Sequence, residues 1–264
     1  MEERSLWDRL MLTGKPWLEA SVAPLKAVLK VQVFTQQPEH RYIFSPEIPL
    51  RRAINTLHIV GWWHNYIMVE EVARELRTEL VLKEPAHGKN LEVLNQIRNS
   101  RHPVSIHVRR GDSTIAATGR AALSFEYYSK AISIFNERFV NPDYFVFSDD
   151  IPFVKDHLPR GIRAVFVDHN DDFSAHEDMR LMSACHHHVL ANSTFSWWGA
   201  WLSPRPDKIV MAPKQWYLTE DSFYPDLMPK SWMLADAVVA GAPTLEQDFS
   251  WSKTVGSVQK SSTK

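Results

Sequence analysis

The stretch His107-Val108-Arg109-Arg110-Gly111-Asp112 is central to the fold, because it closes an apolar run at residues 104–108 and contains two adjacent arginines. Every second residue of this run is apolar, which is typical of a β-strand with one buried face. Paired guanidinium groups offer planar, charge-assisted hydrogen bonds that suit a diphosphate, each worth roughly 1.5–3 kcal/mol. A surface salt bridge to nearby acids is the alternative, and the position at a strand end favours ligand binding.

Four more apolar runs follow along the chain, at residues 144–147, 164–167, 189–191 and 209–211. Between the runs, Ser124 predicts the N-cap of one helix and Pro152 fits the first turn of another. A further helix is predicted over residues 177–188. Upstream, residues 57–63 predict a strand and residues 69–80 an amphipathic helix. Short apolar strands that alternate with helices predict an α/β fold with a parallel sheet covered on both faces.

Polar residues follow four of the predicted strands. The four clusters lie at residues 107–112, 148–150, 168–170 and 192–194. In open α/β sheets, ligands bind beyond the carboxyl ends of the strands. Four clusters at such ends therefore indicate a ligand site, independently of any family.

The cluster Asn192-Ser193-Thr194 leads directly into a tryptophan-rich segment with helical spacing. Free backbone N–H groups and the positive dipole at a helix start can receive a phosphate group. Ordinary helix capping is the alternative, because it needs no ligand. With the arginine pair nearby, we expect Asn192, Ser193 and Thr194 to face an anionic ligand.

Several acidic and metal-ligating side chains have two interpretations. Asp149 and Asp150 can bind a nucleotide through a base N–H or a ribose hydroxyl, or they can cap a helix. Glu177 and Asp178 share this ambiguity, since the first turn of a helix favours acids. The run Cys185-His186-His187-His188 suggests a metal, but at most two of these residues share a helix face, and two ligands do not close a zinc site. We therefore predict no metal site.

Composition argues against several classes of function. The chain has 264 residues and a net charge of −1 at pH 7. It therefore lacks the excess of basic residues that would suggest binding to nucleic acid or to an anionic membrane surface. The single cysteine excludes an internal disulfide framework. The charged N-terminus predicts neither a signal peptide nor a membrane anchor, and a cytoplasmic protein is expected. Residues 1–56 predict only short helices and loops, and residues 248–264 a frayed polar tail.

These blocks, in this order and spacing, resemble glycosyltransferase family 11, the alpha-1,2-fucosyltransferases. The resemblance begins at Gly61-Trp62-Trp63-His64 and is densest at residues 181–186 and 191–202. The other blocks that carry it are residues 107–112, 145–150, 177–179 and 207–210, together with Trp216.

The resemblance implies a GT-B-like fold with two Rossmann-like lobes. On that basis residues 1–100 form an acceptor-side lobe, and residues 101–247 form the lobe that binds a GDP-sugar. Family members open with a glycine-rich loop, whereas Gly14 is the only glycine before Gly61 in this chain. The N-terminal lobe is therefore expected to be truncated. The implied reaction moves L-fucose from GDP-fucose to a hydroxyl of an acceptor glycan, galactose O2 by analogy, with inversion and without a metal or other cofactor.

The resemblance also implies roles for individual residues. Arg109 is expected to bind the β-phosphate and stabilise the departing GDP, with Arg110 in support. His107 and one of Asp149 or Asp150 are expected to contact the guanosine. The residues expected to line the diphosphate end are Ser193, Thr194 and Ser196.

The general base that accepts the proton of the acceptor hydroxyl has two candidates, Asp112 and Glu177, and both are equally explained by pairing or capping. Other functions also fit the sequence. The chain can be a non-catalytic protein that binds a GDP-sugar, a truncated homologue of weak activity, or a transferase for another GDP-sugar. The sequence does not predict an oligomeric state.

Overall fold

The structure is a computed structural model that describes residues 31–35, 56–60, 65–111, 122–216 and 226–237. The chain divides into two compact units, Met1–Val81 with Tyr224–Ser231, and Leu82–Phe223 with Trp232–Lys264. The division at residue 100 into an acceptor-side lobe and a donor-binding lobe stays a prediction. The polar tail predicted at residues 248–264 lies outside the described residues.

The first unit contains a parallel pair of strands and two short helices. The strands are β1 (Val31–Thr35) and β2 (Thr56–Val60), and the helices are α3 (Tyr66–Glu71) and α4 (Ala73–Glu79). The prediction of one helix over residues 69–80 is wrong, because Val72 leaves the helical conformation (φ −118°, ψ 24°) and separates α3 from α4. β1 was not predicted, since residues 31–35 form a single short run without strong flanking signals.

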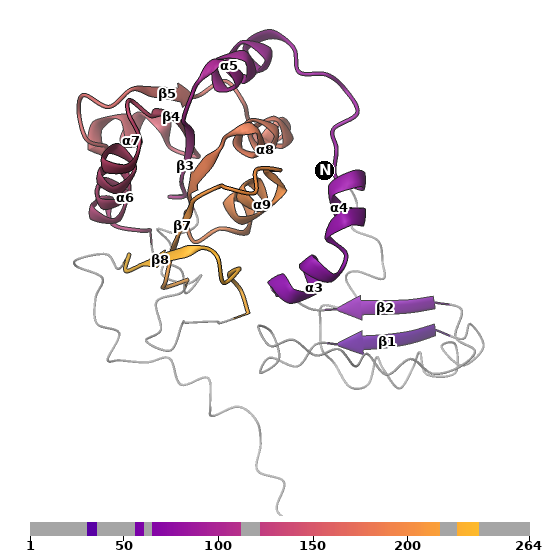
Figure 1. Cartoon of the computed structure of the whole chain (residues 1–264). Coiled ribbons are helices and arrows are strands. Elements are labelled where there is room, and N and C mark those ends of the chain that lie inside the picture. The colour runs from indigo at the N-terminus through magenta and orange to yellow at the C-terminus, as the bar shows by residue number, and fades with distance from the viewer. Residues whose placement is uncertain (1–30, 36–55, 61–64, 112–121, 217–225, 238–264) are drawn as a thin grey trace, which may run out of the picture. The chain divides into compact units, whose positions relative to one another are not determined.

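The second unit is built on a six-stranded parallel sheet (Figure 1). The strands are β3 (Pro103–Val108), β4 (Asp143–Ser148), β5 (Ala164–Val167), β6 (His187–Val189), β7 (Val210–Pro213) and β8 (Met233–Ala235). Their order across the sheet is β5-β4-β3-β6-β7-β8, and all neighbouring pairs are parallel. The predicted α/β class and parallel sheet are confirmed. β8 was not predicted from the sequence.

Helices cover both faces of this sheet, as Figure 1 shows. They are α5 (Gly88–Asn99), α6 (Phe125–Arg138), α7 (Ile151–His157), α8 (Ala175–Ala184) and α9 (Thr194–Leu202). Side chains of successive residues in β4 point to opposite faces of the sheet, so that β4 contacts the helices on both faces. Tyr144 and Val146 pack with α6 and α7, whereas Phe145 and Phe147 pack with α5 and α8.

Local capping follows the predictions at two helix starts. Ser124 accepts a hydrogen bond from the backbone N–H of Tyr127 at the start of α6. Asp150 caps α7, in which Pro152 occupies the first turn, and accepts from the backbone N–H of Phe153 at 3.2 Å. Both caps satisfy N–H groups that have no partner within the helix.

The helix predicted over residues 177–188 is wrong at its C-terminal end. α8 ends at Ala184, and His187 and His188 belong to β6. The two imidazoles add side-chain hydrogen bonds to the backbone ladder of β6. His188 Nδ1 lies 2.8 Å from the hydroxyl of Ser105, and His187 Nδ1 accepts from the backbone N–H of Ile209 at 3.1 Å. Complete burial holds the pKa of His188 well below its ordinary value, so this ring is neutral.

Candidate functional site

The arginine pair and the start of α9 lie at the same edge of the sheet. β3 and β6 are neighbours, and their register pairs Ile106 with Val189. The chain therefore leaves both strands at their shared carboxyl edge, at Arg109 after β3 and at Asn192 shortly after β6. The rings of His107 and Phe195 lie 5.6 Å apart and connect the end of β3 to the first turn of α9. The structure thus brings together two elements that are about 80 residues apart in the sequence.

Asp149 at the end of β4 holds the arginine turn, by which we mean Arg109, Arg110 and Gly111. Its Oδ1 accepts from the backbone N–H of Arg110 at 2.9 Å, and its Oδ2 accepts from the backbone N–H of Gly111 at 2.8 Å. The Nη1 atom of Arg109 lies 3.3 Å from Oδ2. The carboxylate therefore contacts both the backbone and the side chain of the turn.

Arg110 is held against α7. Its guanidinium carbon lies 3.4 Å from the centroid of the Phe153 ring, and its Nε lies 3.6 Å from Oδ2 of Asp150. Its side chain is 23% exposed, compared with 37% for Arg109. The cation–π contact and the ion pair fix Arg110 in place, and Arg109 is the more accessible of the two cations.

His107 is a neutral side chain beneath this edge. Burial lowers its pKa to about 4, the nearby charge of Arg109 acts in the same direction, and Asp149 opposes the shift. Its Nδ1 atom is buried and makes no hydrogen bond within the described part of the chain. A neutral imidazole can exchange a hydrogen bond with a ligand hydroxyl or amide, but it cannot act as a cation for phosphate at neutral pH.

The residues at the start of α9 divide into half-buried and buried groups. Ser193 caps the helix by accepting from the backbone N–H of Phe195 at 3.3 Å, and both Ser193 and Thr194 remain half-buried. Ser196 is buried, and its hydroxyl donates to the carbonyl of Ser193 at 3.0 Å. Asn192 is also buried and donates to the carbonyl of Trp216 at 3.2 Å. Ser193 and Thr194 are therefore the accessible members of this predicted group.

Glu177, a candidate base, lies in a buried ion pair. Arg180 Nε is 3.0 Å from Oε2 of Glu177 without hydrogen-bond alignment, while Arg180 Nη2 donates to Oε1 at 3.3 Å. His176 Nε2 lies 3.8 Å from the same Oε1. The side chain of Glu177 is only 8% exposed, so its carboxylate is committed to Arg180. Asp112, the other candidate base, lies outside the described residues.

Beyond the carboxyl end of β5, the predicted polar residues 168–170 join Asn90, a partner that sequence reasoning missed. The side-chain amides of Asn90 and Asn170 exchange two hydrogen bonds of 2.9 Å. Asn170 also donates to Asp178 at 2.6 Å, and His169 Nε2 lies 2.8 Å from Oδ1 of Asn90. Burial raises the pKa of Asp178 despite the bond from Asn170. Residues 168–170 were predicted as a polar cluster, but nothing in the sequence connects them with Asn90.

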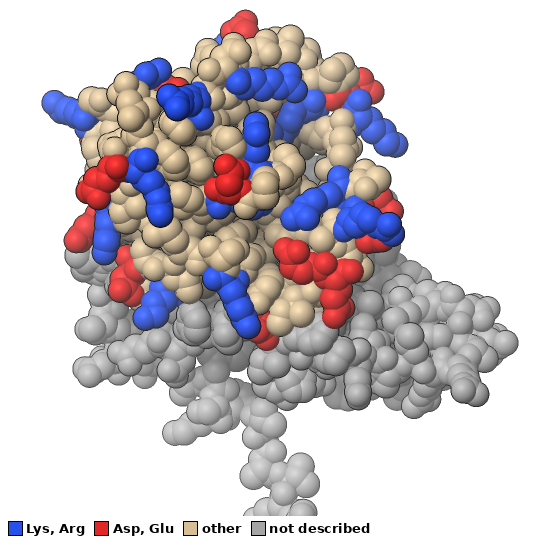
Figure 2. Space-filling model, viewed as in Figure 1, with Lys and Arg blue, Asp and Glu red and all other residues tan. Residues whose placement is uncertain are grey.

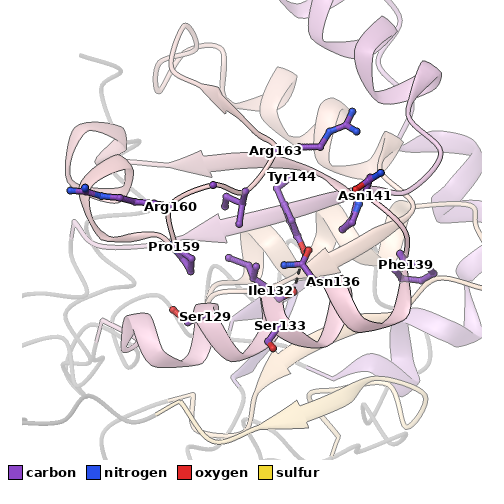
Figure 3. Close-up of a pocket in the computed structure, with 13 residues that line it drawn as sticks. Ser129, Ile132, Ser133, Asn136, Phe139, Asn141, Tyr144, Pro159, Arg160 and Arg163 are labelled. Carbon is purple, nitrogen blue, oxygen red and sulfur yellow. Dashed lines mark hydrogen bonds between the residues drawn. The ribbon is translucent and has the colours of Figure 1, made fainter.

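A separate cavity of about 440 Å³ lies at the amino ends of β4 and β5, beside α6 (Figure 3). Figure 3 shows Tyr144 pointing toward Asn136, to which its hydroxyl donates at 2.8 Å. Arg160 and Arg163 also line this cavity. None of the predicted site residues does, because they lie at the carboxyl ends of the strands.

Charge at the surface is mixed. Figure 2 shows Lys and Arg interspersed with Asp and Glu over the described residues of the visible face, in agreement with a net charge of −1. Any anion must therefore be held by local groups such as the arginine turn. Within the described ranges, no helix is long and apolar enough to cross a membrane. No group of three or more His, Cys, Asp or Glu side chains in these ranges could hold a metal ion.

Comparison with known proteins identifies the class. The profile of glycosyl transferase family 11 matches residues 50–234. The chain is 35% identical over 188 residues to an alpha-1,2-colitosyltransferase of Escherichia coli, which covers 67% of this chain and 62% of that protein. It is 24% identical over 157 residues to the Homo sapiens galactoside alpha-(1,2)-fucosyltransferase 1, which covers 56% of this chain and 43% of that protein.

Among solved structures, the fucosyltransferase NodZ from Bradyrhizobium shares 14% identity and a TM-score of 0.37, over 75% of this chain and 64% of that one. The chain belongs to glycosyl transferase family 11, which confirms the resemblance seen in its motifs. It spans less than two thirds of the length of the two curated relatives.

Proposed function

We propose that this chain is a glycosyltransferase that binds a GDP-sugar at the carboxyl edge of its six-stranded sheet and transfers the sugar to a hydroxyl of an acceptor glycan. Membership of family 11 supports the reaction class. The single observation that supports the site is that the end of β3, which leads into the arginine turn, packs beside the first turn of α9, where the rings of His107 and Phe195 lie 5.6 Å apart. A diphosphate at this point would meet a guanidinium and a helix N-terminus together.

The chemistry proposed for this site is leaving-group stabilisation. When the acceptor hydroxyl attacks the anomeric carbon, negative charge grows on the departing GDP. Donors that are already oriented stabilise such charge without reorganising during the reaction. Arg109 is the proposed contact to the β-phosphate, and Ser193 and Thr194 are the proposed contacts from α9. His107 is the proposed contact to the guanosine as a neutral hydrogen-bonding partner.

L-Fucose from GDP-fucose is the proposed donor sugar, with galactose O2 as the proposed acceptor position and inversion as the proposed stereochemical outcome. Colitose is a second candidate, because it is the sugar named for the Escherichia coli relative. No metal is required in this proposal, since the cationic turn takes the position that a divalent ion would take at a diphosphate. Proton acceptance is assigned to Asp112, because the carboxylate of Glu177 is committed to Arg180.

Donor turnover tests the proposal. Purified protein is incubated with GDP-fucose or GDP-colitose, with and without a galactose-terminated acceptor, and released GDP and the glycosylated product are measured. The expected result is GDP release that depends on the acceptor, with one of the two donors preferred. Saturable donor binding without GDP release would instead support a non-catalytic binding protein. Failure to bind either donor or GDP would refute the proposed function.

A further inference from the structure

Asp149 was one of two candidates, with Asp150, for contact with the guanosine, but its oxygens are directed at the protein's own arginine turn. We infer that Asp149 is a positioning residue, which holds Arg109 in place for the donor's diphosphate and makes no contact with the nucleoside. This inference rests on the proposed donor site. Asp149 would thus orient the guanidinium of Arg109, although the negative charge of Asp149 by itself would repel the diphosphate.

The hydrogen bonds of Asp149 leave little capacity for a ligand. Oδ1 receives the backbone N–H of Arg110 at 2.9 Å, and Oδ2 receives that of Gly111 at 2.8 Å. Oδ2 also lies 3.3 Å from Nη1 of Arg109. An ionised carboxylate only accepts hydrogen bonds, and all three of these groups are donors from consecutive residues. The arginine turn therefore folds around one carboxylate, which is supplied from the end of the neighbouring strand β4.

The absence of a side chain at Gly111 leaves room for this contact. A Cβ atom at this position would lie 2.6 Å from Oδ2 of Asp149, closer than real Cβ contacts allow. A side chain at residue 111 would thus displace the carboxylate from the turn. The glycine permits the close approach that its own N–H group needs to reach Asp149.

The neighbouring acid has a different role. Asp150 caps α7 through the backbone N–H of Phe153 and pairs with Arg110, whose guanidinium lies over the Phe153 ring. The two adjacent Asp–Arg pairs therefore fix different parts of the site. Asp150 keeps Arg110 on α7, and Asp149 keeps Arg109 at the carboxyl edge, where 37% of its side chain is exposed.

The substitution Asp149→Asn distinguishes a positioning residue from a nearby negative charge, because the two roles predict opposite changes in the affinity for an anionic ligand. If Asp149 acts only as a nearby negative charge, Asp149→Asn should strengthen the binding of an anionic ligand, because repulsion is removed. If Asp149 positions Arg109, the same change should weaken binding. The carboxamide retains one acceptor atom and turns its –NH2 group toward a backbone N–H, so the turn loses a hydrogen bond and the ion pair together.

The experiment is a double-mutant cycle of Asp149→Asn and Arg109→Ala, with GDP and GMP affinities measured by calorimetry on variants shown to be folded by circular dichroism. Asp149→Asn should weaken GDP binding about tenfold, change GMP binding less than twofold because GMP lacks the β-phosphate, and cause no further loss when Arg109 is already alanine. Gly111→Ala should reproduce this pattern by displacing the carboxylate. Asp156→Asn, which removes an exposed acid on α7, is the matched control and should leave both affinities unchanged.

Three results would overturn the inference while leaving the proposed function intact. They are GDP affinity that stays equal or rises in Asp149→Asn, an equal loss for GMP and GDP, and a loss that adds fully to that of Arg109→Ala. Should Asp149→Asn fail to fold, Gly111→Ala decides the outcome by the same criteria. Absence of GDP binding by the unaltered protein would refute the proposed donor site itself, and this inference with it.

Discussion

Replacement of Arg109 by alanine is the most direct perturbation of the proposed diphosphate site. The guanidinium is 37% exposed and already oriented by its contact of 3.3 Å with Asp149. A charge-assisted hydrogen bond to phosphate contributes roughly 1.5–3 kcal/mol, and partial exposure places this bond at the lower end because water screens it. A loss of about 1.5–2 kcal/mol corresponds to roughly 10- to 30-fold weaker GDP binding.

Isothermal titration calorimetry with GDP measures this loss, and thermal unfolding establishes that the variant is folded. Arg163→Ala is the matched control, because it removes the same charge from a side chain that is 62% exposed and paired with Asp143 at the opposite edge of the sheet. GDP affinity of this control should change less than twofold. Unchanged affinity in folded Arg109→Ala, or an equal loss in Arg163→Ala, would refute the reasoning.

Three further predictions concern acid stability, helix packing and metal dependence. Acidification from pH 7 to pH 5 should lower the free energy of unfolding by about 2 kcal/mol through His107, because its buried imidazole has a pKa of about 4 and stays neutral, whereas the unfolded imidazole, with a pKa near 6.5, takes up a proton. Burial lowers the pKa of His188 and acts in the same direction, and urea unfolding at both pH values measures the combined loss. Gly199→Ala should destabilise the protein by roughly 1 kcal/mol, because the new Cβ atom would lie 3.0 Å from Cβ of Met182 in α8. This loss is expected although alanine favours helices, and a higher melting temperature of the variant would contradict it. EDTA should leave the rate of sugar transfer unchanged, because arginine and helix N–H groups are proposed to neutralise the diphosphate. A strict requirement for Mn²⁺ or Mg²⁺ in the transfer assay would contradict this prediction.

Local patterns predicted the central strands well. The alternating residues at 104–108 and the apolar runs at 144–147 and 164–167 became β3, β4 and β5 within one residue at either end. Pro152 and Ser124 marked helix starts for reasons that act within a single turn. The role of Glu177 also had a local signal, because Arg180 follows three residues later on the same helix face.

The failures have a different physical origin. Histidines at 187 and 188 were placed at the end of the helix predicted over residues 177–188. They form a strand because the sheet supplies hydrogen-bond partners, Ser105 and the backbone of Ile209, that are distant in the sequence. Tertiary context overrides local propensity in such short segments.

The amino-acid sequence by itself determined the α/β class, the positions of the main strands and the family, because alternation, caps and motif spacing act over a few residues or are preserved in linear order. Tertiary structure alone decided which acid holds which arginine and how Asn90 meets Asn170. These contacts join residues about 40 to 80 positions apart. Only the lateral order of the strands brings such residues within hydrogen-bonding distance, and no local pattern encodes that order.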